Sequence, residues 1–208
     1  MKVYDGAMPE ATATPQPMLA DVDDFVAWVQ GQRERYEFMG GRLVMMAGGS
    51  EDHNDVQINL LASMKRHLRG GPCKPNGSDL LVRIDDRTGR FPDASVTCGR
   101  EGRHYVTAPV AIFEILSPAT ELADRTDKRR DYQRPASLRH YVLIAQDAPR
   151  VEIYSRTAGG WRFEELDDLD AALPLEALDI TLPLAEIYDG LSLPATDTVS
   201  EEPGVSGG

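Results

Sequence analysis

The spacing of apolar residues along the chain predicts three helices. In residues 21–32, apolar side chains recur at helical spacing behind acidic residues of the first turn, which is typical of a short amphipathic helix. Residues 51–70 follow Ser50, repeat apolar positions at helical spacing and end at a glycine pair, so they form the second predicted helix. Residues 120–134 predict a third helix, which is rich in charged residues and ends before Pro135.

Strands are predicted between and after these helices. Residues 34–48 form a predicted hairpin across Gly40-Gly41, and later strands are expected over 78–85, 90–98, 110–117, 138–146, a hairpin around 158–160, and a short strand and helical turn within 178–191. The 110–117 and 138–146 runs are almost continuously apolar, which indicates burial on both faces. This order of elements predicts a mixed α/β domain with a central sheet flanked by helices.

Chain length and composition favour a single globular domain. The chain has 208 residues, of which 41% are hydrophobic and 27% are charged. Residues 19–193 are the expected domain, while residues 1–18 and 194–208 have the composition of flexible tails. No apolar run reaches the length of a membrane span, and the N-terminus lacks an apolar signal core.

The two cysteines, Cys73 and Cys98, do not form a CxxC pattern and are too few for a disulfide framework. We therefore interpret them as inert thiols. That interpretation and the absence of a signal core favour a reducing, cytoplasmic location, and the absence of an apolar run of membrane-spanning length argues against a membrane partner.

The net charge of −12 is unevenly distributed along the chain. Twelve of the 34 acidic residues lie in residues 164–208, which contain no Lys, Arg or His, so residues 1–163 hold 22 acidic and 22 basic residues. Local basic clusters therefore decide whether nucleic acid binds. Two such clusters stand out, residues 65–69 and the basic positions of residues 125–134.

Two carboxylates interrupt apolar strands and are the first candidates for chemistry. Asp93 and Glu114 lie on consecutive predicted strands, where pairing would place both side chains on one face. Two carboxylates at that separation suit Mg²⁺, which keeps several waters and accepts substrate phosphates. The alternative is that each carboxylate pairs with an arginine, for instance Arg90 or Arg83.

The charged helix offers a cation near this end of the sheet. Asp124, Lys128 and Tyr132 are spaced by four and share one helix face. An ammonium at Lys128 can stabilise a developing phosphorane oxyanion. The alternative is a solvated helix with surface pairs such as Asp124–Lys128 and Asp127–Arg130.

Together, the segments FPDASV, FEILSPATELADRTDKRRDYQ and LRHYVLI resemble the PD-(D/E)XK nucleases, and within them the bacterial Uma-two family. The similarity extends from Asp21 to Leu193. It implies a restriction-endonuclease-like α/β fold and Mg²⁺-dependent hydrolysis of DNA phosphodiester bonds, with Mn²⁺ as an alternative ion.

The resemblance also implies roles for individual residues. Asp93 and Glu114 correspond to the metal-binding acids. Glu37 corresponds to an additional acid of the first hairpin, and its expected catalytic role is that of a third metal ligand or a water-orienting carboxylate. Leu116 stands where the superfamily motif has lysine, and Lys128 resembles the relocated lysine of this family. Phosphate contacts are expected from Arg125, Arg129 and Arg130 of the basic helix, and from His53 at the start of the helix predicted over 51–70. His53 is equally compatible with a structural role.

Two other functions compete with a DNA endonuclease. One is a DNA-binding or regulatory protein that has the fold without turnover, which the leucine at position 116 favours. The other is a metal-dependent hydrolase of small phosphate compounds. If the substrate is cleaved on both strands, one small domain needs a second active site, which makes a homodimer possible.

Overall fold

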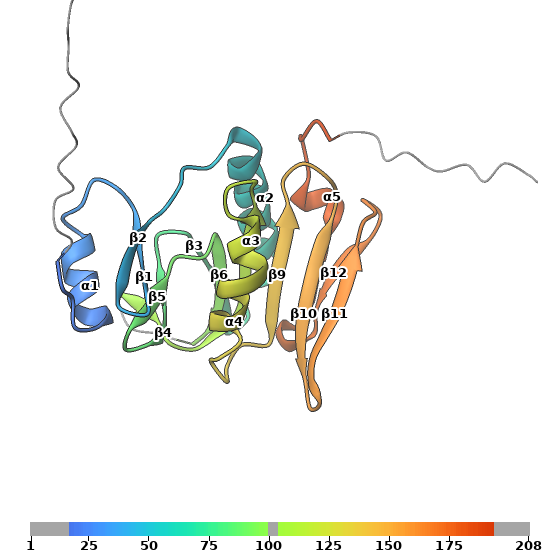
Figure 1. Ribbon diagram of the computed structural model, residues 1–208. Helices are drawn as coiled ribbons and strands as arrows, with labels where there is room; N and C mark the ends of the chain where they lie inside the picture. The colour runs from blue at the N-terminus through green and yellow to red at the C-terminus, as the bar shows by residue number, and fades with distance from the viewer. Residues whose placement is uncertain (1–16, 100–103, 194–208) are drawn as a thin grey trace, which may run out of the picture.

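The computed structural model describes residues 17–99 and 104–193. Nearly all of the expected N-terminal tail (1–18) and the whole expected C-terminal tail (194–208) lie outside these ranges. In the described ranges, the chain forms two main sheets, a small two-stranded sheet and several helices (Figure 1).

The N-terminal part of the chain forms a five-stranded sheet. Its order is β2 (Arg42–Met45), β1 (Tyr36–Met39), β5 (Thr88–Arg90), β4 (Leu81–Asp85) and β7 (Tyr105–Val106). The predicted hairpin between β1 and β2 is confirmed. Gly40 and Gly41 form its turn with φ of 58° and 86°, values that favour glycine. Helix α1 (Val22–Val29) packs its buried Val22 and Phe25 against this sheet.

A six-stranded mixed sheet forms the centre of the molecule. Its order is β11 (Gly160–Leu166), β10 (Val151–Thr157), β9 (His140–Ala145), β8 (Pro109–Leu116), β6 (Ala94–Cys98) and β3 (Cys73–Gly77). Strands β8 and β9 are parallel, and the other neighbours are antiparallel. The chain then adds β12 (Ala172–Leu175), a 3-10 turn (Glu176–Leu178), β13 (Ile180–Pro183) and helix α5 (Leu184–Ile187). The structure therefore confirms the predicted mixed sheet with flanking helices.

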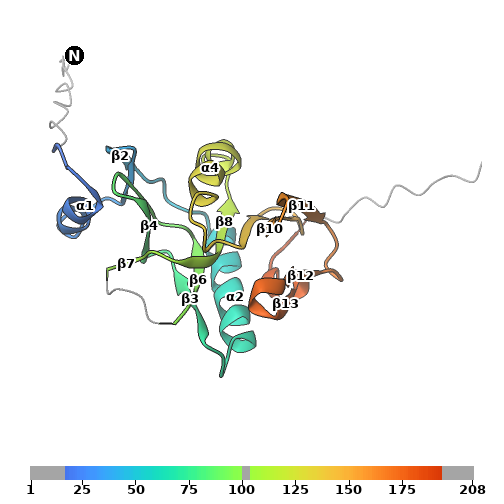
Figure 2. The ribbon, with the colours of Figure 1, turned by 90° about the horizontal axis from the view of Figure 1, so that it is seen from below.

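Helices cover both faces of the six-stranded sheet (Figure 2). Helix α2 (Glu51–His67) lies on one face and is capped by Ser50, whose side chain accepts a hydrogen bond from the His53 amide. The other face carries one helical segment made of α3 (Glu121–Ala123), a π-helical turn (Asp124–Lys128) and α4 (Arg129–Tyr132).

Strand β8 separates two hydrophobic clusters, as its predicted two-sided burial requires. Ala111, Phe113 and Ile115 pack with α2, whereas Ile112 and Leu116 pack with α4 and β9. Because side chains alternate along a strand, Glu114 belongs to the second face, toward the π-helical turn. The strand thus directs one carboxylate into the layer that contains Lys128.

The predicted single strand over residues 90–98 is wrong. Arg90 ends β5 in the five-stranded sheet, and Ala94 begins β6 in the six-stranded sheet. Pro92 lies between them and has no backbone N–H for a ladder, which interrupts strand pairing. Residues 91–93 are therefore a crossing segment between the two sheets, and they include Asp93.

The interpretation of the cysteines as inert thiols is also wrong, because Cys73 and Cys98 form a disulfide. The two residues are directly paired across β3 and β6, with their Cα atoms 3.9 Å apart. Residues 72–77 contain proline, lysine and glycine, so the pattern did not predict β3 and hence did not predict this proximity. The disulfide removes the cysteine argument for a reducing location.

None of the helices in residues 17–99 and 104–193 has the length and apolar composition that a membrane crossing requires.

Candidate active site

The antiparallel pairing of β6 with β8 brings the two predicted carboxylates together. Ala94 is paired with Phe113, so Asp93, one residue earlier, lies opposite Glu114, one residue later. The Ile115 amide donates a hydrogen bond of 2.7 Å to Asp93 Oδ2, which fixes this side chain at the end of the sheet. The expected juxtaposition of the acids is therefore present.

Lys128 reaches the same place from the helical segment. Its Nζ lies 3.1 Å from Glu114 Oε2 and 2.8 Å from Asp124 Oδ1. Asp124, Lys128 and Tyr132 are all buried, as expected from their shared face. The Asp124–Lys128 pair is consequently part of the buried site, whereas Asp127 and Arg130 form the expected surface pair at 2.9 Å.

Burial and neighbouring charges shift the ionisation of this group. Burial raises the pKa of Glu114 well above the ordinary glutamate value, and the Lys128 ammonium offsets only part of that effect. Burial alone would lower the pKa of Lys128, but the carboxylates of Glu114, Glu37 and Asp124 outweigh it and raise that pKa. The lysine is therefore a cation, whereas Glu114 is a carboxyl group that needs additional positive charge to ionise fully.

Unpaired carboxylate oxygens provide a test of whether a metal ion fits. No donor in the described part of the chain forms a hydrogen bond with Glu114 Oε1 or Asp124 Oδ2, although both atoms are buried. Buried carboxylate oxygens without a partner are costly, and a cation beside them removes that cost. Asp93 and Glu114 supply the one or two carboxylates that Mg²⁺ usually takes from a protein. A larger cage is absent, since no cluster of three or more His, Cys, Asp or Glu side chains suited to a metal occurs in the described residues.

Glu37 is also buried at the site, but both of its oxygens accept hydrogen bonds. Arg90 Nη1 donates to Oε2 at 2.9 Å, and the Phe91 amide donates to Oε1 at 3.2 Å. Arg90 is itself 1% exposed and also pairs with Asp131 at 2.6 Å. This arginine therefore neutralises Glu37 and links β1 and β5 to α4.

His53 lies beside Asp93 at the start of α2. The distance between His53 Nε2 and Asp93 Oδ2 is 3.3 Å, and both side chains are largely buried. Ser50 caps the helix by accepting a hydrogen bond from the His53 amide, which fixes the backbone from which the imidazole side chain extends. The position is consistent with either expected role, because the ring contacts both a candidate ligand and the pocket.

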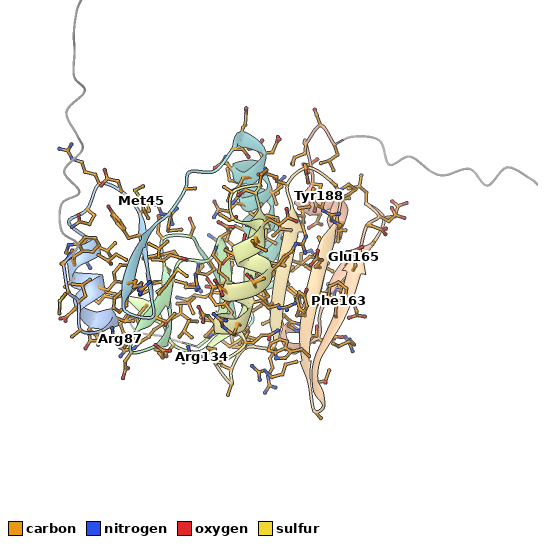
Figure 3. All side chains as sticks on the ribbon, in the orientation of Figure 1. Met45, Arg87, Arg134, Phe163, Glu165 and Tyr188 are labelled. Carbon is orange, nitrogen blue, oxygen red and sulfur yellow. A yellow bond between two sulfur atoms is a disulfide. The ribbon has the colours of Figure 1, made fainter. Side chains whose placement is uncertain are left out.

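These side chains face a pocket of about 310 Å³. Glu37, His53, Asp93, Glu114 and Lys128 all contribute to its lining. Its rim on β2 is apolar and includes Met45, which is 62% exposed (Figure 3). The pocket therefore combines a charged floor with an apolar rim.

The three arginines predicted to contact phosphate do not line this pocket. Arg125 pairs with Glu121 and Glu152, and Arg129 donates a hydrogen bond to Tyr154 Oη while its guanidinium lies 5.0 Å from the centre of that ring. Arg130 is highly exposed. A phosphate role for these residues remains a prediction, and the structure places Arg125 and Arg129 against β10.

The arginine alternative considered for Asp93 and Glu114 is not what the structure contains. Arg90 pairs with Glu37 and Asp131, and Arg83 pairs with Asp23 and Asp86. Sequence reasoning missed the Arg90 bridge and the role of Asp124 as a buried partner. The sequence offered no signal for the Arg90 bridge, because its partners Glu37 and Asp131 are distant in the sequence.

Taken together, the fold and the site define a restriction-endonuclease-like α/β protein with a carboxylate–lysine pocket. Residues 22–185 match the model of the Uma2 family, which is described as "Putative restriction endonuclease". The chain belongs to this family, and membership supports a nuclease function. The resemblance drawn from the sequence is thus confirmed.

Similar proteins include two from Synechocystis sp. (strain ATCC 27184 / PCC 6803 / Kazusa), both named as uncharacterized. The protein slr1290 is 31% identical over 185 residues, covering 86% of this chain and 96% of its own length. The protein sll1609 is 27% identical over 154 residues, covering 71% of this chain and 87% of its own length.

A solved structure from Anabaena variabilis ATCC 29413 has a similar fold, with a TM-score of 0.66. It is described as a putative nuclease belonging to DUF820, is 18% identical, and the match covers 81% of this chain and 97% of that one. At this level of identity the comparison establishes the fold.

Proposed function

We propose that the chain is a Mg²⁺-dependent endonuclease that hydrolyses phosphodiester bonds of DNA. The observation that carries the proposal is the buried Glu114 carboxyl group, which lies opposite Asp93, pairs with Lys128 and keeps one oxygen unpaired. Family membership supports the nuclease reaction, and the donor set supports the metal.

Asp93 and Glu114 would hold Mg²⁺, and the bound ion would polarise a phosphoryl oxygen and acidify a water molecule. Hydrolysis forms a bond between the water oxygen and phosphorus, breaks one P–O ester bond, and leaves an alcohol that takes up a proton. The Lys128 ammonium lies 3.1 Å from Glu114 Oε2. When substrate is bound, it can donate a hydrogen bond to a phosphate oxygen instead of to this carboxylate. His53 holds Asp93 in place or contacts the phosphate, and Glu37 holds Arg90 at the rear of the pocket.

Metal titration of the full chain and a cleavage assay test this proposal together. We expect Asp93→Asn and Glu114→Gln to weaken Mg²⁺ or Mn²⁺ binding at least tenfold in calorimetry and to abolish cleavage of plasmid DNA, with the fold retained. Glu165→Gln is the matched control, because this exposed carboxylate lies on β11, far from the pocket (Figure 3). Unchanged metal affinity in Asp93→Asn would overturn the metal assignment. DNA binding without cleavage by the parent protein would instead favour the inactive nuclease-fold alternative.

The size of the pocket favours one competing function. A cavity of about 310 Å³ is at the lower end of the range of about 300–1,000 Å³ for small-molecule sites, so a small phosphate ester is the second candidate substrate. Hydrolysis of such an ester, without any salt-dependent binding of DNA, would favour this function over an endonuclease.

A further inference from the structure

A series of hollows follows one side of α2 and leads away from the pocket. The pocket includes His53, the next hollow includes Gln57 and Leu61, and the last includes Lys65. These four residues are spaced by four and therefore share one helix face. Strand β3 (Cys73–Gly77), the edge of the six-stranded sheet, forms the opposite wall of the second and third hollows.

The hollows are connected through neighbouring residues and hydrogen bonds. The second and third hollows meet at Leu61 and Ala62 on α2, and at Pro75 and Asn76 on β3. The first and second are joined by Gln57, whose Nε2 donates a hydrogen bond of 2.7 Å to the Asp93 carbonyl. We call the second and third hollows, which lie between α2 and β3 and adjoin the pocket at Gln57, the α2–β3 groove.

Arg35 marks the junction between the pocket and the groove. It lines the pocket, and its Nη2 donates a hydrogen bond of 2.7 Å to the carbonyl of Ser78, which lines the second hollow. Its side chain is half exposed and lies 3.9 Å from the fully exposed Asp79, a separation at which an exposed ion pair is weak. The junction therefore presents the Arg35 cation to solvent, next to the exposed Asp79 carboxylate that lines the second hollow.

The far end of the groove is basic. Lys65, Arg69 and Lys74 line it, and all three are exposed. In the described part of the chain, no carboxylate forms an ion pair with any of them, whereas Arg66 and His67 are both paired with Glu186. The groove thus ends in three cations whose charge is available to a ligand.

We propose that the α2–β3 groove carries the sugar–phosphate backbone of the nucleic-acid substrate away from the cleavage pocket. The inference rests on the proposed function and adds the route that the substrate takes. The groove begins beside Asp93 and His53, passes Arg35, and ends at Lys65, Arg69 and Lys74. A polyanion is the occupant that matches this charge.

The length of the groove agrees with several phosphates. Twelve residues of helix separate His53 from Lys65, which corresponds to about 18 Å at 1.5 Å per residue. One strand of B-form DNA advances about 3.4 Å per phosphate along the helix axis. The route from the pocket to the end of the groove therefore spans about five phosphates on one side of the scissile bond.

The test is the salt dependence of DNA binding by the full chain, measured without cleavage in Ca²⁺. Lys65→Gln/Arg69→Gln should lower the slope of log K against log salt by about 1.8 for duplex or about 1.4 for single-stranded DNA, and weaken binding about tenfold to hundredfold near 0.1 M salt. Arg33→Gln/Arg139→Gln is the matched control. It removes the same charge from exposed positions outside the three hollows, and both slope and affinity should stay near the parent values.

Three outcomes overturn the proposal. Equal loss of slope in both double variants would show that DNA responds only to net charge, and an unchanged slope in Lys65→Gln/Arg69→Gln would show that the groove does not contact DNA. Loss of binding without a change in slope would indicate a different occupant. Each of these results is compatible with continued cleavage by the parent protein, so the groove can fail while the proposed nuclease function stands.

Discussion

Glu114 is the one carboxylate on a strand that is otherwise buried and apolar, so its charge depends on its immediate neighbours. Lys128 supplies one positive charge, but Asp124 shares that lysine. Two carboxylates, Glu114 and Asp124, therefore share a single ammonium group, and Asp93 adds a third carboxylate opposite Glu114. This excess of negative charge is the physical reason to expect a divalent cation at the site.

The raised pKa of Glu114 predicts a pH dependence of stability in the metal-free protein. The folded state keeps a proton on this residue that the unfolded state releases above its ordinary value of 4.5. The contribution of Glu114 to the unfolding free energy should therefore be fully present below that pH and be lost as pH rises through the raised pKa. Glu114→Gln should remove this part of the pH dependence. Urea unfolding at pH 5 and pH 8, with chelator present, measures the difference, and an equal pH dependence in both proteins would contradict the assignment.

Lys128 is predicted to act on charge that develops during the reaction. Lys128→Met fills the same space without the ammonium, and we expect saturated cleavage to slow by roughly a hundredfold or more while DNA binding changes little. Lys128→Arg should restore little activity, since a planar guanidinium does not replace a compact point charge. Single-turnover cleavage with thermal unfolding as a stability check makes the measurement. A parent rate in Lys128→Met would show that the lysine only neutralises buried acids.

At the scale of elements, the disulfide fastens an edge strand to the sheet that carries the site. Strand β3 has few residues that favour strands, yet it forms one wall of the α2–β3 groove. Cys73 and Cys98 join it to β6 at their shared end. The disulfide therefore stabilises β3 in the sheet, whereas the residues of β3 themselves have little preference for a strand.

Cys73→Ser/Cys98→Ser should consequently lower the unfolding free energy by about 3.5 kcal/mol, the value expected for closing a loop of this length. The sequence separation is 25 residues. Urea unfolding of the oxidised protein measures the change, and the parent protein under reducing agent should match the variant. Free thiols in the unfolded, unreduced parent protein would show that the bond does not form.

Much of the order of helices and strands could be predicted from the pattern of apolar and polar residues, and the strands that were predicted wrongly have physical causes. Ser50 and the helical spacing behind it predicted α2, and the paired glycines predicted the first hairpin. Pattern missed β3 because its sequence is poor in strand-forming residues, and it extended β6 back across Pro92 to Arg90, which is the last residue of β5. Both errors concern which strands pair, and pairing depends on contacts distant in the sequence.

The candidate site could be predicted only in part, again because some of its contacts join residues that are distant in the sequence. Asp93, Glu114 and Lys128 come together as expected, because alternation along β8 and four-residue spacing on the helix determine their directions. The partners of Arg90 were not predictable, because they lie on β1 and α4 and meet only when the two sheets assemble.

At the scale of the whole molecule, the two edges of the six-stranded sheet differ in charge. The acidic residues of β11 lie at the edge opposite β3 (Figure 1), whereas Lys65, Arg69 and Lys74 line the hollow beside β3. Glu186 of α5 lies on the α2 side and pairs there with Arg66 and His67. A net charge of −12 therefore coexists with a basic groove. Long-range repulsion of DNA by the acidic side is reduced at physiological salt, where the screening length is about 8 Å.

Residues 91–93 form the short crossing segment between β5 of the five-stranded sheet and β6 of the six-stranded sheet, and the position of Asp93 at its end places this acid in the site. Asp93 faces Glu114 only because β6 begins one residue later in a definite register. One residue inserted between Asp93 and Ala94 would turn Asp93 to the opposite face, since side chains alternate along a strand. The hairpin turn at residues 158–160 has no comparable constraint. A length change that this distant loop absorbs would, between Asp93 and Ala94, separate the two acids while leaving the composition of the site intact.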